Sequence, residues 1–265
     1  MRPLAVVGNL SLDRVDGGPR PGGAPLYAAR ALRVLGRPAV VAVKCADADR
    51  RLLLPPLVRL GVPVLWRGGD STAAFSYRYD GDRREMVVES LGPRWTPADL
   101  RGLERAEWVH VGALARSDFP ARTLAVLARE RKLSFDGQGL VRPARTGPLE
   151  LDPDYDPEVL RRVAVLKLAE DEARALVGEP DADALRGLGV REVVVTLGSR
   201  GSLVLANGRL EHVRARPVEG AIDPTGAGDA FSAAYIVGRA AGHAPVAAAR
   251  RATALVAGLL GRRLR

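Results

Sequence analysis

Short apolar runs alternate along the chain with longer segments in which apolar residues recur every three or four positions. The short runs, bounded by turn residues, are typical of buried strands, and the longer segments are typical of amphipathic helices. The predicted strands cover residues 4–7, 40–45, 108–111, 133–136, 163–168 and 192–196, and the predicted helices cover 25–35, 50–60, 122–131, 170–177, 227–241 and 246–260. Repeated strand–helix–strand units predict an α/β fold with a mostly parallel sheet and helices on both faces.

One segment departs from this alternation, between residues 71 and 89. Two stretches of alternating residues flank Asp80-Gly81, and this arrangement predicts a β-hairpin. An edge hairpin without a functional role is the alternative to a functional one. The length of 265 residues and the hydrophobic content of 47% allow one large core. We therefore predict a single domain over 1–265, with the hairpin as a small insertion at about 71–90.

Charge and cysteine content narrow the function classes. The net charge is +9, and acidic residues alternate with the basic ones along the chain. That pattern favours a solvated charged surface over a nucleic-acid-binding face, so no nucleic-acid partner is expected. The single cysteine, Cys45, excludes an internal disulfide and fits a reducing compartment. Because no apolar run is long enough to span a membrane and a strand pattern begins at once, we expect a cytoplasmic protein without membrane contact.

The most informative stretch is 222–237, which begins with Ile-Asp-Pro-Thr-Gly-Ala-Gly-Asp-Ala-Phe. Its Asp-Pro-Thr forms a turn, and the two glycines give the backbone freedom where a helix begins. A glycine-rich helix N-terminus predicts an anion site. Asp229 would repel a phosphate on the same amides, so its position indicates a proton acceptor that faces an incoming hydroxyl group. These parts suffice for phosphoryl transfer, although an ordinary capped helix is the alternative.

The block from Asp223 to Phe231 resembles the signature of the ribokinase-like (PfkB) carbohydrate kinases. This resemblance implies a ribokinase-like three-layer sandwich in which the predicted hairpin is a small lid over the sugar. It also implies that Asp229 is the catalytic base and that the amides of Gly226, Ala227 and Gly228 form the anion hole. A lid would exclude water, so that the phosphoryl group reaches the acceptor instead of being hydrolysed.

The resemblance extends to the acceptor side of the site. Family members have an Asp after the first strand and a Gly-Gly pair before the first helix, and both touch the sugar hydroxyls. Asp13, Gly22 and Gly23 inherit this substrate-binding role, with a plain loop aspartate as the alternative for Asp13. The family pattern then has an Asn where this chain reads Pro25-Leu26-Tyr27, so we expect an atypical pocket.

The stretch 136–142 reads Asp-Gly-Gln-Gly-Leu-Val-Arg. It resembles the Asp-x-Gln-Gly-x-x-Arg of a family branch that includes archaeal and bacterial inositol kinases. In that branch the Arg lies near the substrate or the transferred phosphate, a role that suits its forked cation. Gln138 and Arg142 are therefore predicted to bind substrate, and a polar loop with a surface Arg is the alternative.

The stretch 167–172 aligns with the family's Asn-x-x-Glu, whose Glu orders water around Mg²⁺. Glu172 is in register, but Ala169 stands at the Asn position. Because Mg²⁺ keeps several waters and needs few protein ligands, the resemblance still implies a water-mediated metal contact for Glu172. Glu170 and Asp171 could compensate for the missing Asn, or they could be first-turn helix acids.

The stretch 196–201 resembles the family's Val-Thr-x-Gly-x-x-Gly, which lines the nucleotide. The cofactor-binding residues that the resemblance implies are Thr196, Gly198, Gly201, Thr225, Gly226 and Gly228. The adenine pocket is expected on the helix 246–260, around 252–258. A Rossmann site is disfavoured because no Gly-x-Gly-x-x-Gly opens the first helix, and the chain has no Gly-Lys pair for a P-loop. His110 is predicted to be a core residue, and His212 and His243 lack partners at metal-ligand spacing.

The sequence thus predicts an ATP- and Mg²⁺-dependent kinase that phosphorylates a hydroxyl group of a small sugar or polyol. Activation by a monovalent cation such as K⁺, found in many family members, is left open, as is the choice between monomer and homodimer. Two alternatives remain: a nucleoside or vitamin kinase of the same fold, and a catalytically silent sensor that binds sugar or nucleotide. The intact Gly-Ala-Gly-Asp argues against the silent sensor, which has no need of a base.

Overall fold

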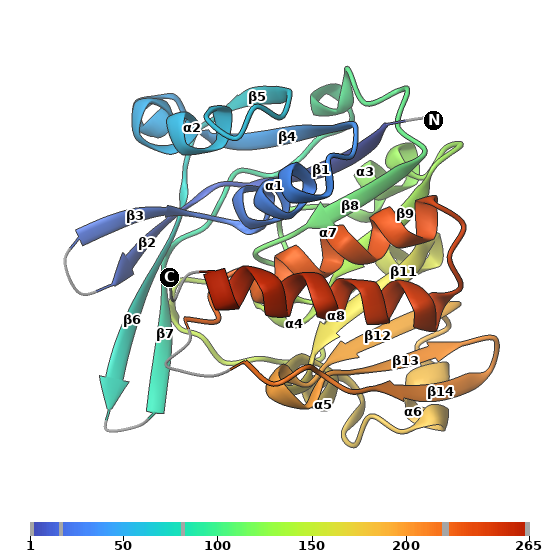
Figure 1. Ribbon diagram of the computed structural model, residues 1–265. Helices are drawn as coiled ribbons and strands as arrows, with labels where there is room; N and C mark the ends of the chain where they lie inside the picture. Colours follow the sequence, from blue (N-terminus) through green and yellow to red (C-terminus); the bar gives the residue numbers. More distant parts are fainter. Residues whose placement is uncertain (1–2, 16–17, 81–82, 219–222, 263–265) are drawn as a thin grey trace.

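The structure is a computed structural model, and it describes residues 3–15, 18–80, 83–218 and 223–262. In these residues a nine-stranded sheet has the order β14-β13-β12-β11-β9-β8-β1-β4-β5 (Figure 1). Its strands are β1 (Leu4–Asn9), β4 (Ala39–Ala46), β5 (Val64–Gly69), β8 (Trp108–Gly112), β9 (Lys132–Asp136), β11 (Val163–Ala169), β12 (Glu192–Thr196), β13 (Ser202–Ala206) and β14 (Arg209–Val213). Neighbouring strands from β5 to β12 are parallel, and β13 and β14 extend the sheet antiparallel. The prediction of a mostly parallel sheet is confirmed.

Helices cover both faces of this sheet, which gives the three predicted layers. The helices are α1 (Ala24–Leu35), α2 (Arg50–Val58), α3 (Ala121–Leu127), α4 (Gln138–Val141), α5 (Glu170–Val177), α6 (Ala182–Gly187), α7 (Ala227–Ala240) and α8 (Pro245–Arg262), with 3-10 turns at Asp47–Asp49, Pro97–Leu100, Pro157–Arg162 and Gly198–Arg200. Apolar side chains of α1, α2, α7 and α8 share one core with the sheet, and those of α3, α5 and α6 share the other. Successive β1 residues alternate between the two cores, as the period of a strand requires.

The predicted helix over 122–131 is too long at its C-terminal end, because α3 ends at Leu127. Glu130 has a φ of 63°, a left-handed conformation that an α-helix does not contain. The prediction for His110 is confirmed. It is fully buried on β8, its Nδ1 lies 3.2 Å from the Ser134 hydroxyl oxygen, and burial lowers its pKa to about 4. The imidazole is therefore a neutral core group at physiological pH.

A second sheet in the described residues has five strands in the order β10-β7-β6-β2-β3. Its strands are β2 (Ser11–Val15), β3 (Gly18–Gly22), β6 (Ala73–Asp80), β7 (Arg83–Ser90) and β10 (Gly147–Pro148). The antiparallel pair β6 and β7 forms where the hairpin is predicted, and the turn residues Gly81 and Asp82 lie outside the described residues. This sheet stands beside the carboxyl ends of the parallel strands, at the lower left of Figure 1.

This second sheet is larger than the predicted hairpin at 71–90, and Asp13 is not the loop aspartate considered as the alternative. Asp13 lies inside β2, which pairs parallel with β6 and antiparallel with β3. Strand β3 was not predicted because residues 18–22 are glycines, prolines and one arginine. A proline lacks the N–H group that a central strand needs, so such a stretch does not resemble a strand. Strand β3 is at the edge of its sheet, where one side of the backbone needs no partner.

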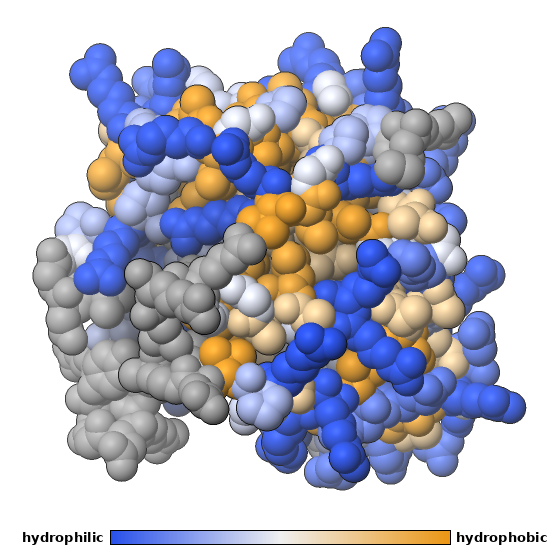
Figure 2. Space-filling view, viewed as in Figure 1, coloured by the Kyte–Doolittle hydropathy of each residue, from blue (hydrophilic) through white to orange (hydrophobic). Residues whose placement is uncertain are grey.

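Hydrophilic residues are spread over the visible face of the molecule, as the dispersed charges along the sequence predict (Figure 2). Figure 2, viewed from the side of α7 and α8, shows hydrophilic side chains around a central group of apolar ones. No helix within 3–15, 18–80, 83–218 and 223–262 is both long and apolar enough to cross a membrane.

Candidate active site

Helix α7 begins at the carboxyl edge of the parallel strands, after a tight turn. The Thr225 amide donates to Asp223 Oδ1 at 3.0 Å, and the Ala227 amide donates to the Pro224 carbonyl oxygen at 2.9 Å. Gly226, at the N-cap, has a φ of 77°, and a Cβ added there would lie 2.1 Å from Cδ1 of Tyr27. Both observations require glycine at this position. Ile222, the first residue of the motif, lies outside the described residues.

The predicted anion hole has fewer available backbone amides than the motif suggests. The Ala227 amide already closes the turn, and Ala227 does not line the cavity that Gly226, Gly228 and Asp229 share. A backbone amide that is committed to a turn is not available to a phosphate oxygen. Ala227 therefore shapes the turn, and the amides of its neighbours are the donors that can stabilise an anion.

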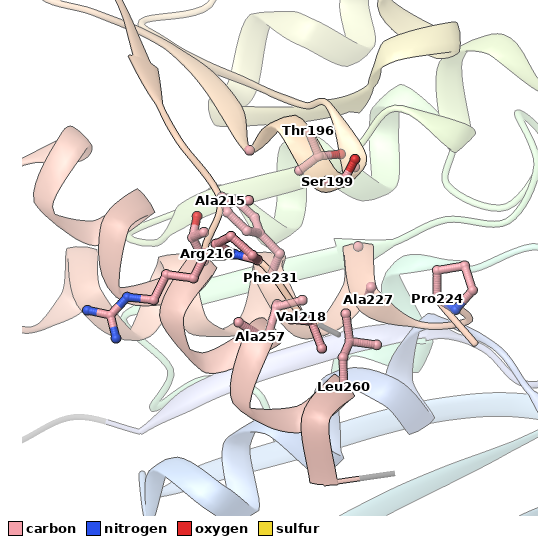
Figure 3. A pocket seen from close by; sticks show the side chains of 16 residues that line it. Thr196, Ser199, Ala215, Arg216, Val218, Pro224, Ala227, Phe231, Ala257 and Leu260 are labelled. Carbon is pink, nitrogen blue, oxygen red and sulfur yellow. The ribbon is translucent and has the colours of Figure 1, made fainter. Parts of the chain in front are cut away.

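Three adjoining cavities follow the carboxyl edge of the sheet. The α8 cavity (about 620 Å³; Figure 3) is mostly apolar and includes Phe231, Val256 and Leu260 in its wall. The central cavity has about 600 Å³ and is polar. The lid cavity has about 170 Å³ and lies under the five-stranded sheet. Gly228 lines the first two cavities, and Asp229 lines the last two. The three spaces therefore form one path, with Asp229 at the junction of the central and lid cavities.

Asp229 is poised to exchange a proton. The surrounding protein desolvates its carboxylate, and this effect, together with the nearby Asp136 carboxylate, raises its pKa to about 7. The cations of Lys167 and Arg142 act in the opposite direction. A carboxylate with a pKa near the operating pH is an effective general base.

Behind Asp229 lies a buried group of charges that the sequence analysis missed. Lys167 Nζ lies 3.3 Å from Asp136 Oδ2, and both side chains are almost fully buried. Burial alone would lower the pKa of Lys167, but the carboxylates of Asp136, Glu172 and Asp229 raise it above its ordinary value. A Cβ added at Gly228 would lie 3.1 Å from Nζ, so the ammonium group lies against the start of α7. The signal available in the sequence was a lysine inside the apolar run 163–168.

The acids of α5 have distinct roles. Glu172 is buried and its Oε2 accepts the Ala169 amide at 2.7 Å, so it caps the N-terminus of α5. Glu170 forms ion pairs with Arg174, at 2.7 Å, and with Arg200. No cluster of three metal-binding side chains occurs in the part of the chain that the structure describes. A water-mediated contact from Glu172, which lines the central cavity, fits Mg²⁺ carried by phosphates.

The predicted acceptor residues converge on the lid cavity. Asp13 is buried in its wall and accepts the Ser11 hydroxyl at 2.8 Å. A Cβ on Gly22 would lie 2.2 Å from Asp13 Oδ2, so Gly22 makes room for the carboxylate, whereas Gly23 lines the cavity itself. The aromatic residues of this wall, absent from the predicted set, are Tyr27, Phe75 and Tyr77.

Gln138 and Arg142 line both the lid cavity and the central cavity. The Arg142 guanidinium carbon lies 6.0 Å from the centre of the Phe75 ring, so strand β6 of the lid holds it in place. An arginine at this junction can contact an acceptor hydroxyl on one side and a phosphate on the other.

The predicted nucleotide residues divide between the cavities. Thr196 and Gly198 line the α8 and central cavities, and Gly201 lines the α8 cavity. A Cβ on Gly201 would lie 2.0 Å from the Val213 carbonyl oxygen, so this glycine serves a close backbone contact. Thr225, expected beside the nucleotide, instead lines the lid cavity.

Comparisons with known proteins identify related sugar and polyol kinases. The chain is 28% identical to a fructokinase of Escherichia coli over 83% of this chain and 77% of that one. It is 33% identical to a Klebsiella pneumoniae fructokinase over 59% of this chain, and it spans about half the length of that relative, 53%. A solved pyrophosphate-dependent kinase in the ribokinase family, complexed with a pyrophosphate analog and myo-inositol, superposes with a TM-score of 0.85 at 26% identity and covers 97% of this chain and 94% of its own.

The family model of the pfkB carbohydrate kinases matches residues 14–262, which is most of the chain. The matched range contains the turn before α7, the base candidate Asp229 and the residues of the central cavity, and it begins directly after Asp13 of the lid cavity. The ribokinase-like fold predicted from the sequence is the fold that the structure has. The chain belongs to the pfkB family of carbohydrate kinases.

Proposed function

We propose that this protein transfers the γ-phosphoryl group of ATP to a hydroxyl group of a small sugar or polyol. The observation that carries the proposal is the position of Asp229, whose carboxylate stands where the central cavity meets the lid cavity. A phosphate chain in the central cavity and an acceptor in the lid cavity would meet at this carboxylate. The family and its fructokinase relatives act on the same class of acceptor.

In the transfer, the Asp229 carboxylate accepts the proton of the acceptor hydroxyl group. At the same time, the oxygen of that hydroxyl group forms a bond to the γ-phosphorus. The bond between the γ-phosphorus and the bridging oxygen breaks, and ADP leaves. Backbone amides at the start of α7, the guanidinium of Arg142 and the ammonium of Lys167 stabilise the charge on the phosphoryl oxygens. Glu172, which lines the central cavity, would order the waters of a Mg²⁺ ion carried by the phosphates, and that ion would further neutralise the phosphoryl charge.

The α8 cavity supports a nucleotide as donor. Its wall includes the apolar side chains of Phe231, Val256 and Leu260, and its volume of about 620 Å³ is within the range of small-molecule sites. Pyrophosphate would need only the polar central cavity and would leave this apolar space without a ligand. For this reason we propose ATP as the donor, although the solved relative complexed with myo-inositol is pyrophosphate-dependent.

The lid cavity supports a small acceptor. Its volume of about 170 Å³ is below the roughly 300 Å³ at which sites for drug-sized ligands begin. Asp13 offers a carboxylate to sugar hydroxyls, and aromatic rings offer an apolar surface to the face of a sugar ring. The solved relative contains myo-inositol, and a cyclic polyol or a monosaccharide fits these dimensions better than a nucleoside.

The test is product release across a panel of inositols, pentoses, hexoses, deoxy sugar acids and nucleosides, with Mg-ATP and with Mg-pyrophosphate as donors. We expect ADP release with a small sugar or polyol, little phosphate release from pyrophosphate, and almost no turnover in Asp229→Asn. Repeating the successful reaction with Na⁺ replaced by K⁺ tests activation by a monovalent cation. Undiminished turnover in Asp229→Asn would contradict the assigned base, and ATP binding without turnover on any acceptor would favour a sensor.

A further inference from the structure

The acceptor cavity has a neighbour on the other side of the turn that precedes α7. This α1 groove has a volume of about 460 Å³ and includes Val34, Ala230 and Leu259 in its wall. Three residues line both the lid cavity and the α1 groove, namely Tyr27, Thr225 and Gly226. Of these three, Tyr27 has the largest side chain. Its ring is therefore the main body of the wall between the two spaces.

The Tyr27 ring is held on two sides. Gly226 has no side chain, and a Cβ there would lie 2.2 Å from Tyr27 Cγ, so the turn is packed directly against the ring. The guanidinium carbon of Arg30 lies 5.3 Å from the ring centre, within the range of a cation–π contact. These two contacts hold the ring in the wall between the lid cavity and the α1 groove.

Tyr27 lines the lid cavity together with Asp13 and Asp229. Burial, the carboxylate of Asp13 and, more weakly, that of Asp229 raise the pKa of Tyr27 to about 12. The phenol therefore remains protonated at physiological pH, and it can donate a hydrogen bond to an acceptor oxygen. Tyr27 can therefore offer a hydrogen-bond donor within the lid cavity, and its ring forms part of the wall toward the α1 groove.

We propose that Tyr27 is the specificity-determining residue of the acceptor site, where its ring sets the size limit and its hydroxyl binds the acceptor. This proposal rests on the proposed function, because it assigns the lid cavity to the acceptor. Replacing the ring by a smaller side chain would join the lid cavity of about 170 Å³ to the α1 groove of about 460 Å³. Acceptors that carry a substituent too large for the lid cavity, such as a nucleoside, would then fit.

The experiment compares kcat/KM for a monosaccharide or cyclic polyol with kcat/KM for a nucleoside in four proteins: wild type, Tyr27→Ala, Tyr27→Leu and Tyr27→Phe. In the alanine and leucine variants we expect the ratio to move toward the nucleoside by about tenfold or more, the scale of discrimination that pocket volume gives. Tyr27→Leu keeps carbon atoms against Gly226, so it preserves the test if the alanine variant does not fold.

Tyr27→Phe separates the hydroxyl from the ring. Loss of one hydrogen bond predicts a KM for the small acceptor raised about 2–10-fold, a nearly unchanged kcat and an unchanged size preference. Val34→Ala, on the groove wall away from the lid cavity, is the matched control and should change neither quantity. An unchanged ratio in folded Tyr27→Ala and Tyr27→Leu would overturn the size limit, and an unchanged KM in Tyr27→Phe would overturn the role of the hydroxyl.

Calorimetric binding keeps this inference separate from the proposed function. In Asp229→Asn, in which we expect almost no turnover, the binding of a small polyol and of a nucleoside can be measured with and without Tyr27→Leu. A shift of relative affinity toward the nucleoside supports the role of Tyr27 even if no phosphoryl transfer is found. Absence of binding for every acceptor, before and after the Tyr27 change, would overturn the role of Tyr27.

Discussion

At the level of single residues, the raised pKa of Asp229 suits a general base, and it also lowers the stability of the folded protein at neutral pH. Its pKa of about 7, against an ordinary 3.8, means that a desolvated carboxylate must lose its proton for the enzyme to work. We expect kcat/KM for the acceptor to rise about tenfold per pH unit below pH 7 and to level off above it. A profile of kcat/KM against pH, measured at low acceptor concentration, checks this, and a flat profile between pH 5.5 and 8 would contradict it.

The raised pKa of Asp229 also makes the stability of the protein depend on pH. Because the folded-state pKa is raised, the favourable contribution of Asp229 is complete below pH 3.8 and is lost as the pH rises through about 7. Asp229→Asn should therefore be more stable than the wild type at pH 8, by about 2–4 °C in Tm for each kcal/mol recovered, and the difference should shrink toward pH 4. Thermal unfolding at several pH values measures this. A variant that is less stable at pH 8 would show that the carboxylate supports the fold.

The positive charge of Lys167 compensates the buried carboxylates around it. Its removal should change both the stability of the protein and the pKa of Asp229. Lys167→Met leaves Asp136 buried without its partner at 3.3 Å, which should reduce the free energy of unfolding by about 3–5 kcal/mol. It also removes a charge that lowers the pKa of Asp229, so the acid limb of the pH–rate profile should move to higher pH.

The matched control for Lys167 is the double variant Asp136→Asn with Lys167→Met. It removes both charges of the buried pair, so it should recover part of the stability that Lys167→Met loses, and the recovered part measures the coupling of the pair. If the double variant loses the sum of the two single losses, Lys167 and Asp136 act independently of one another.

At the level of elements, the N-terminus of α7 depends on one glycine. Gly226→Ala would place a methyl group 2.1 Å from the Tyr27 ring in a left-handed backbone, so we expect lower stability and a loss of turnover of about a hundredfold or more. Gly258→Ala in α8 is the control, because its Cβ would meet no atom within 4 Å in an exposed helix interior. It should raise stability by about 0.5–1 kcal/mol. Equal effects of the two changes on turnover would contradict the role given to Gly226.

Elements with a strong local signal could be predicted from the sequence, and elements defined by distant partners could not. Strand β12 and helix α5 have the predicted bounds, since an apolar run or a period of three to four residues identifies each of them locally. Strand β2 acquires its structure from pairing with β6, about sixty residues along the chain. The charged group behind Asp229 could not be predicted for the same reason, because β9, β11 and α5 contribute Asp136, Lys167 and Glu172 to it.

At the level of the whole molecule, the α8, central and lid cavities should behave as separable binding regions along one path. Ala257 lies on α8 in the wall of the α8 cavity, whereas Ala254 is exposed on the same helix. Ala257→Trp should fill the space assigned to the nucleoside and leave the other two cavities intact, and Ala254→Trp is its control.

Ligand-induced shifts of Tm make this separation measurable. At a concentration of 100 Kd, Mg-ATP should stabilise the wild type and Ala254→Trp by about 2.7 kcal/mol. Ala257→Trp should lose this stabilisation and keep that of the acceptor, because the lid cavity lies beyond Asp229. If Ala257→Trp instead keeps its response to ATP, the adenosine moiety lies outside the α8 cavity. The α8 cavity would then no longer favour ATP over pyrophosphate as the donor. Asp229 would remain the assigned base, since that assignment depends only on the junction of the central and lid cavities.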